Sequence, residues 1–187
     1  MSPKSYDYQL FESTNGVCGI AWSNTGIRLF QLPSRTMQAT ERNLLRRLPN
    51  AKAGAPPPLV IDAITAAERY FSGERIDFSG IELDLAEQSD FSRRCYQAAR
   101  RVGWGQTTTY GTLAKELGGA PDTAREVGRA MAGNPIPLIV PCHRVLAAGG
   151  QLGGFSAPGG SDAKLRMLQL EGYRVSATVA DQQSMEF

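Results

Sequence analysis

A cysteine and a histidine stand side by side in residues 134–145, which read NPIPLIVPCHRV. An apolar run, residues 136–140, ends at a proline, and Cys142 and His143 follow it. His143 is the single histidine among 187 residues. A histidine beside a thiol suits a base and its nucleophile, whereas most free cysteines pack as small hydrophobic residues. These two residues alone leave both interpretations open.

The other cysteines favour core packing. Cys18 falls within an expected strand and Cys95 on the apolar side of an expected helix. An odd set of three cysteines without a C-x-x-C pair argues against a disulfide framework and favours a reducing compartment. One histidine and no cysteine cluster argue against a zinc site. The glycine-rich residues 155–160 lack the lysine and spacing of a phosphate-binding loop, so no metal or other cofactor is expected.

Length and composition indicate an ordinary globular protein of one or two domains, with 42% hydrophobic and 20% charged residues. No apolar run approaches the roughly 20 residues that span a bilayer, and the N-terminus lacks an apolar signal region. We therefore expect no membrane partner and a cytoplasmic location, in a bacterial cytosol. The net charge is +2, but residues 90–145 have eight basic and four acidic side chains. This basic segment is compatible with DNA and equally with solvated helices.

Residues 1–85 are predicted to form a small α/β domain. Partial alternation predicts strands over residues 6–13, 17–22 and 27–32, and the proline-rich residues 51–58 predict a surface connection. Helical spacing predicts helices over residues 36–48 and 59–71. Their expected apolar sides consist of Met37, Leu44, Leu45, Leu48 and of Ile61, Ile64, Ala67, Phe71. Nothing in this domain has recognisable chemistry, so its expected role is structural support.

Residues 86–172 are predicted to form a mainly helical domain, followed by a polar, partly disordered tail over residues 173–187. The expected helices are residues 91–102, 110–117, 163–170, and one that begins at Pro121 and ends before Gly133. Gly118-Gly119 separates two short helices, which is a helix-turn-helix pattern that many structural helix pairs share. Gly149-Gly150 predicts a tight turn.

The helix that follows Pro121 has one side suited to DNA. At about 100° per residue, Arg125, Arg129 and Ala132 share this side. The expected core side consists of Ala124, Val127, Gly128 and Met131. Two guanidinium groups beside a small residue let a groove wall come close. Taken alone, the pattern is more typical of a solvated face.

These pieces, in this order, resemble one family. The matching stretches are Thr109-Tyr110-Gly111 with Leu113-Ala114, Ala124-Arg125-Glu126-Val127-Gly128, Asn134-Pro135, Pro141-Cys142-His143-Arg144-Val145, Leu152-Gly153-Gly154-Phe155 and residues 168–172. They resemble the O6-alkylguanine-DNA alkyltransferases, also called methylated-DNA–protein-cysteine methyltransferases. The match covers residues 91–172, with PCHRV its most specific part. The resemblance implies an α/β (α+β) fold whose N-terminal domain is ribonuclease-H-like.

The resemblance also implies a reaction: direct-reversal DNA repair. Cys142 matches the cysteine that accepts the alkyl group from a flipped O6-alkylguanine, and O4-alkylthymine is an expected second substrate. A thiol with a pKa of about 8.5 supplies little thiolate at neutral pH. His143 matches the histidine that deprotonates it through a water molecule, and Glu171 the carboxylate that orients this histidine. Water does not reverse a thioether, so each molecule is expected to act once.

Contacts with the substrate are implied by the same resemblance. Tyr110 matches the tyrosine that crowds the target phosphate and donates a hydrogen bond to the flipped base. Arg125 matches the arginine that fills the vacated place in the stack, and Asn134 the asparagine at the hinge between the helix pair and the active-site segment. Ala124 and Arg129 are also assigned to DNA contact, and Val145, Phe155 and Ser156 to the base pocket. The expected partner is duplex DNA that contains O6-alkylguanine, bound through its minor groove by a monomer.

This chain departs from the family at the pocket loop. Where relatives often have Tyr-Arg or Tyr-Ser-Gly-Gly, it has Phe155-Ser156-Ala157-Pro158, which leaves the preferred alkyl group open. Two other functions compete with alkyl transfer. A lesion-binding protein of the alkyltransferase-like type lacks the acceptor cysteine, which is present here. A cysteine hydrolase leaves the helix pair unexplained, and adjacent Cys-His is an unusual hydrolytic pair.

Overall fold

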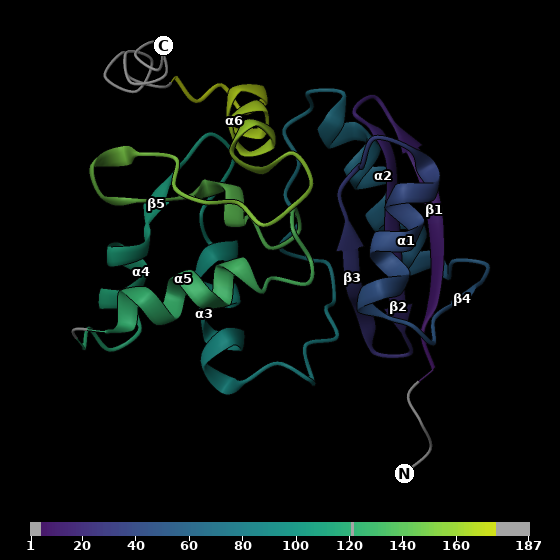
Figure 1. The fold of residues 1–187 in the computed structure, drawn as a ribbon, viewed down its shortest axis with the longest axis horizontal. Coiled ribbons are helices and arrows are strands. Elements are labelled where there is room, and N and C mark those ends of the chain that lie inside the picture. The colour runs from purple at the N-terminus through teal and green to yellow at the C-terminus, as the bar shows by residue number, and fades with distance from the viewer. Residues whose placement is uncertain (1–4, 121, 175–187) are drawn as a thin grey trace.

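One end of the molecule is a sheet with two helices (Figure 1). The computed structural model describes residues 5–120 and 122–174. Three antiparallel strands and a short parallel one form the sheet, in the order β3-β2-β1-β4. The elements of this N-terminal unit are β1 (Asp7–Ser13), β2 (Gly16–Ser23), β3 (Gly26–Gln31), α1 (Met37–Arg47), β4 (Lys52–Ala53) and α2 (Pro58–Phe71).

The two helices cover opposite faces of this sheet. Successive side chains of a strand point to opposite faces, so each strand supplies both layers. One layer packs Leu44 and Leu48 of α1 against Tyr8, Ala21 and Leu29. The other layer packs α2 against the sheet and consists of residues that include Ile20, Trp22, Phe30, Val60, Ala63 and Ala67. The sheet is therefore buried on both sides.

The other end of the molecule is mainly helical (Figure 1). Its elements are α3 (Asp90–Arg100), β5 (Thr108–Thr109), α4 (Tyr110–Glu116), α5 (Thr123–Ala132), the 3₁₀ turn η1 (Cys142–Arg144), β6 (Val145–Leu146), the 3₁₀ turn η2 (Ala148–Gly150) and α6 (Gly160–Leu170). Side-chain oxygens of Ser89 and Thr109 cap α3 and α4. The parallel pair β5–β6 joins the start of α4 to the chain that leaves η1.

The expected α/β class is confirmed, together with the three strands, the helices and the turn at Gly149-Gly150. Met37 and Ile61 were wrongly placed on apolar sides, since they are 50% and 49% exposed. Residues 51–58 include β4, which was not predicted, and α6 begins three residues earlier than expected. Pro121 and the tail from residue 175 lie outside the described residues.

The two ends share one hydrophobic cluster. It runs from Phe11 and Tyr70 in the N-terminal unit to Leu113 and Met167 in the helical unit. The connection 72–89 is fixed on both sides, because Asp84 N donates to Ile27 O at 2.8 Å and Arg100 donates to three carbonyls of residues 78–81. The predicted boundary after residue 85 therefore falls in a connection that is packed against both units. In the described ranges, no helix is long and apolar enough to cross a membrane.

Gly26 is required where this connection meets β3. Its φ is +146°, and a Cβ there would lie 2.7 Å from Glu82 O, the carbonyl that accepts from Ile27 N. Gly26→Ala should therefore lower the free energy of unfolding by about 2 kcal/mol or more, measured by urea denaturation. Gly80→Ala is the control, since nothing lies within 4 Å of its Cβ position. Equal effects of the two substitutions would contradict this account.

Candidate active site

The thiol of Cys142 follows a buried, non-helical run of main chain. Residues 136–140 are all buried, and Leu138 has a φ of +78°, which is uncommon for a residue with a side chain. Cys142 N then donates to Val140 O at 2.8 Å, and Arg144 N to Pro141 O at 2.9 Å. The second of these bonds belongs to the 3₁₀ turn η1, and the first fixes the main chain that enters it.

Asn134 ties this run together. Its Nδ2 donates to Val140 O at 2.9 Å, and its Oδ1 accepts from Ile136 N at 2.9 Å. The main-chain oxygen of Asn134 accepts from Arg47 of α1 at 3.1 Å. Asn134 is only 5% exposed, so both of its amide atoms are used inside the protein. It thereby links the end of α5 to the segment that holds Cys142.

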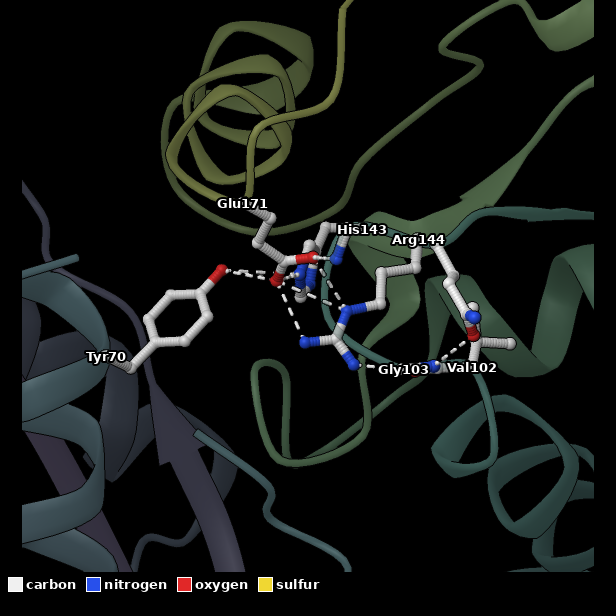
Figure 2. A network of polar contacts seen from close by, with 8 residues as sticks. Tyr70, Val102, Gly103, His143, Arg144 and Glu171 are labelled. Atoms are coloured by element: carbon white, nitrogen blue, oxygen red, sulfur yellow. Dashed lines mark hydrogen bonds and ion pairs between the residues drawn. The ribbon is translucent and has the colours of Figure 1, made fainter. Parts of the chain in front are cut away.

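A buried ionic network surrounds the carboxylate of Glu171 (Figure 2). Glu171 Oε1 accepts from His143 Nε2 at 2.7 Å, from the Tyr70 hydroxyl at 2.8 Å and from Arg144 Nη2 at 2.9 Å. Glu171 Oε2 accepts from Arg144 Nε at 2.9 Å and from Gly105 N at 3.2 Å. The side chains of His143 and Glu171 are fully buried. Arg144 in turn donates to Val102 O at 2.6 Å.

The protonation states in this network follow from its geometry. Burial opposes ionisation of Glu171, but hydrogen bonds and charge from His143 and Arg144 prevail and lower its pKa to about 2. An ionised carboxylate only accepts, so the hydrogen of neutral His143 must be on Nε2. Its Nδ1 is then the basic nitrogen, and this buried atom has no partner among the described residues. Burial lowers the pKa of His143, which keeps the ring neutral and able to take a proton.

Cys142 is protonated in this resting arrangement. The residue is 6% exposed, and burial raises the pKa of its thiol. Asn134, the main-chain N–H groups of Cys142 and His143, and the charge of Lys164 act in the opposite direction. Lys164 is itself fully buried, donates to Val145 O at 2.7 Å, and has its pKa lowered to about 8 by burial. The surroundings therefore favour a thiolate once a base has taken the proton.

Two cavities meet at Cys142. One, of about 390 Å³, is lined by Tyr110, Gly128, Met131, Ala132, Cys142, Gly154, Phe155 and Ser156. The other, of about 440 Å³, opens toward α1 and includes Asn43, Arg46, Arg47, Asn134 and Cys142. Both fall in the size range of small-molecule sites. The first lies between the helix pair α4–α5 and the loop that contains Ser156, whose hydroxyl donates to Ala132 O at 2.7 Å.

The outer side of α5 is free for a partner. Arg125, Arg129 and Ala132 are exposed, and the Arg125 side chain is 80% exposed with one hydrogen bond to Asp122. Val127, Ala130 and Met131 are buried on the opposite side. Ala124 is half-buried and packs against the core. The predicted exposed side is confirmed, and Ala130 replaces Gly128 as a fully buried position.

Comparisons with known proteins agree on one family. Residues 90–173 match the family model described as 6-O-methylguanine DNA methyltransferase, DNA binding domain. A methylated-DNA–protein-cysteine methyltransferase from Mycolicibacterium paratuberculosis is 36% identical, over 88% of this chain and 92% of that relative. One from Mycobacterium leprae is 45% identical, over 61% of this chain and 66% of that relative. The crystal structure of Mycobacterium tuberculosis OGT in complex with DNA has a TM-score of 0.68 and 31% identity, covering 89% of this chain and 93% of that one. This chain belongs to the methylated-DNA–protein-cysteine methyltransferase family.

In this methyltransferase, most predicted site residues converge on one place. Cys142, Tyr110, Phe155 and Ser156 line the same cavity, while His143, Glu171 and Asn134 lie in the buried layer behind it. Val145 is fully buried, and its carbonyl accepts from Lys164; it is not among the described lining residues of either cavity at Cys142. No group of three or more His, Cys, Asp or Glu side chains that could hold a metal occurs in residues 5–120 and 122–174.

The sequence analysis assigned no role to Arg144, Tyr70 or Lys164, which the structure places in this site. Tyr70 has the spacing of a core residue of α2, and its partner Glu171 is 101 positions away. Lys164 lies in an expected amphipathic helix, where lysines are usually exposed. The sequence offered one indication that Lys164 is buried. Lys164 lies between Ala163 and Leu165 and on the same side of the helix as Leu168. The methyltransferase site therefore includes a tyrosine from the N-terminal unit.

The lowered pKa of Glu171 predicts a pH-dependent stability. The ionised carboxylate contributes stability that is complete above its ordinary pKa of 4.5 and is lost as the pH falls toward 2. Glu171→Gln should lower the free energy of unfolding at pH 7 by roughly 3 kcal/mol. The difference from wild type should shrink as the pH falls from about 5 to 2. Urea unfolding at several pH values measures it, with exposed Glu12→Gln as the control. A difference that stays constant from neutral to acidic pH would contradict the assignment.

Proposed function

We propose that Cys142 accepts an alkyl group, irreversibly, from O6-alkylguanine in DNA. One observation carries the proposal: Cys142 lines a cavity beside a helix pair, and the buried histidine that follows it has a basic nitrogen without a partner among the described residues. An alkyl carbon stacked inside a duplex cannot reach a buried thiol, so the base must leave the stack. The cavity bounded by Tyr110, Met131 and Phe155 receives it. Direct reversal of DNA damage is the resulting function.

Proton transfer precedes the displacement. The Cys142 proton passes to His143 Nδ1 through a water molecule, as the family pattern implies. The hydrogen on His143 Nε2 stays there and remains hydrogen-bonded to Glu171. Glu171 stabilises the imidazolium that forms. The thiolate then attacks the alkyl carbon in line, the carbon–O6 bond breaks, and its electron pair stays on the guanine. The Tyr110 hydroxyl donates a hydrogen bond to the departing base.

The product explains why the reaction ends after one turnover. The new carbon–sulfur bond has no leaving group that the neighbouring His143 could activate for water. Cys142 is therefore consumed with the lesion, and the protein is a stoichiometric reagent. O4-alkylthymine presents the same alkyl–oxygen bond and is a second substrate.

In the proposed function, α5 contacts the DNA, and a single copy of the chain is sufficient for binding. Exposed Ala132 and the arginines Arg125 and Arg129 fit the minor groove, where small residues let the backbone approach and guanidinium groups reach the bases. Arg125 occupies the space that the flipped base leaves, and half-buried Ala124 lies next to it. The thiol, its base and this helix come from one chain, which suits a monomer. The three free thiols suit a reducing cytosol.

A lesion-binding protein without transfer is the alternative function. It would use the same helix pair and cavity to hold the flipped base. Such proteins lack the acceptor cysteine, whereas Cys142 is present here beside His143. Transfer is therefore the function that the site supports better.

The decisive experiment measures the mass of the tryptic peptide of residues 130–144 by mass spectrometry. The protein is incubated with duplex DNA that contains O6-methylguanine and is then digested with trypsin. We expect Cys142 to gain one methyl group, up to one equivalent per protein, while Cys18 and Cys95 stay unmodified because they are completely buried and line neither cavity at Cys142. Cys142→Ala is the control. An unmodified peptide in spite of tight lesion binding would select the alternative function.

Arg125→Ala tests the role of α5. Its loss removes the side chain that stabilises the opened stack, and unstacking costs a few kcal/mol. We expect the rate of transfer from duplex DNA to fall by about tenfold or more, while the rate with free O6-benzylguanine stays within about twofold. Arg69→Ala, on the exposed side of α2, is the control and should change neither rate. Equal losses on both substrates would refute the role in the stack.

A further inference from the structure

Tyr70 is the one described side chain of the N-terminal unit that bonds to the buried base system. Its hydroxyl donates to Glu171 Oε1 at 2.8 Å and lies 3.4 Å from His143 Nε2 (Figure 2). Oε1 is the same oxygen that accepts from His143 Nε2 at 2.7 Å. The hydroxyl and the imidazole therefore donate to the same carboxylate oxygen. The hydrogen bond from each donor reduces the negative charge with which this oxygen can stabilise the other donor.

The Tyr70 ring is held rigidly in place. It is completely buried, and it makes edge-to-face contacts with Phe71 at 5.2 Å and Trp104 at 5.3 Å between ring centroids. Burial and the nearby charge of Glu171 raise the pKa of Tyr70 far above its ordinary value. The hydroxyl thus keeps its hydrogen and acts as a permanent donor to Glu171.

The charges around His143 come from two elements, η1 and α6. Arg144 lies on η1 itself, and Glu171 and Lys164 belong to the end and the middle of α6. Glu171 favours the imidazolium, whereas Arg144, Lys164 and burial oppose it. Tyr70, from α2, adds a fourth influence that acts through the carboxylate. Without opposition, a buried carboxylate at 2.7 Å would leave His143 protonated and useless as a base.

We propose that Tyr70 is a positioning residue that acts on the base through Glu171: its hydroxyl, donated to Glu171 Oε1, draws charge from the carboxylate and, together with burial, keeps His143 neutral until the thiol gives up its proton. Arg144 already fixes the carboxylate through both oxygens, so orientation alone does not require the tyrosine. The added donor changes how strongly Glu171 supports the imidazolium. This inference rests on the proposed function of His143 and assigns the N-terminal unit a part in it.

Tyr70→Phe removes the hydroxyl and keeps the ring. Glu171 then concentrates its charge on His143, so the pKa of His143 should rise by roughly 0.5 to 1 unit. His143 is the only histidine, so histidine-selective NMR follows its titration without assignment. The acid limb of the rate–pH profile with O6-benzylguanine should move upward by the same amount. The variant should therefore react about 3- to 10-fold more slowly below the pKa and at the wild-type rate at high pH.

Tyr8→Phe is the matched control. Tyr8 is also buried and donates to a carboxylate, Glu41 Oε1, at 2.6 Å, but it packs under α1 in the other layer of the sheet. Its substitution should leave both the titration of His143 and the rate profile unchanged. The inference is overturned if the pKa of His143 is the same in Tyr70→Phe as in wild type, or if Tyr70→Phe and Tyr8→Phe shift this pKa equally. It is also overturned if His143 stays neutral down to pH 4.5 in both wild type and Tyr70→Phe. Failure of wild type to transfer the alkyl group would instead overturn the proposed function, and NMR would still report on Tyr70.

Discussion

The candidate active site depends on the buried negative charge of Glu171. Glu171 is 4% exposed, and an ionised carboxylate inside a protein is tolerated only when donors surround it. Its donors are Tyr70 from α2, Gly105 from the loop after α3, and His143 and Arg144 from η1. Three distant parts of the chain must therefore meet at the end of α6. A shift of any one of them leaves a charge or a donor buried without its partner.

The same charge determines how the thiol can react. Because Glu171 is ionised, His143 presents Nδ1 as its basic nitrogen, and a raised pKa keeps Cys142 in the thiol form at rest. A buried thiol is a poor nucleophile toward chance electrophiles. In the proposed reaction, it gains reactivity only when a substrate fills the cavity and its proton passes to His143. This restraint suits a residue that is consumed in one reaction.

Much of the fold and of the site could be predicted from the sequence. Period-2 and period-3.6 patterns located the strands and helices, and the PCHRV motif located Cys142 and His143. Met37 and Ile61 were misplaced because apolar spacing does not reveal which side a neighbour covers. The two-residue strands β4, β5 and β6 are too short for any pattern. Tyr70 was not predicted to belong to the site, because its role is visible only once Glu171, from the far end of the chain, packs against it.

The N-terminal unit is consequently more than a support. Sequence reasoning found no chemistry in it, since its residues are those of an ordinary core. Yet it donates three hydrogen bonds to the site. Phe30 N of the sheet donates to Pro135 O, and Arg47 of α1 donates to Asn134 O. The Tyr70 hydroxyl of α2 donates to Glu171. The first two bonds act on the main chain that leads to Cys142, and the third acts on Glu171, the partner of His143. A unit bonded to both the nucleophile segment and the carboxylate helps to hold them in place, so the site depends on both units.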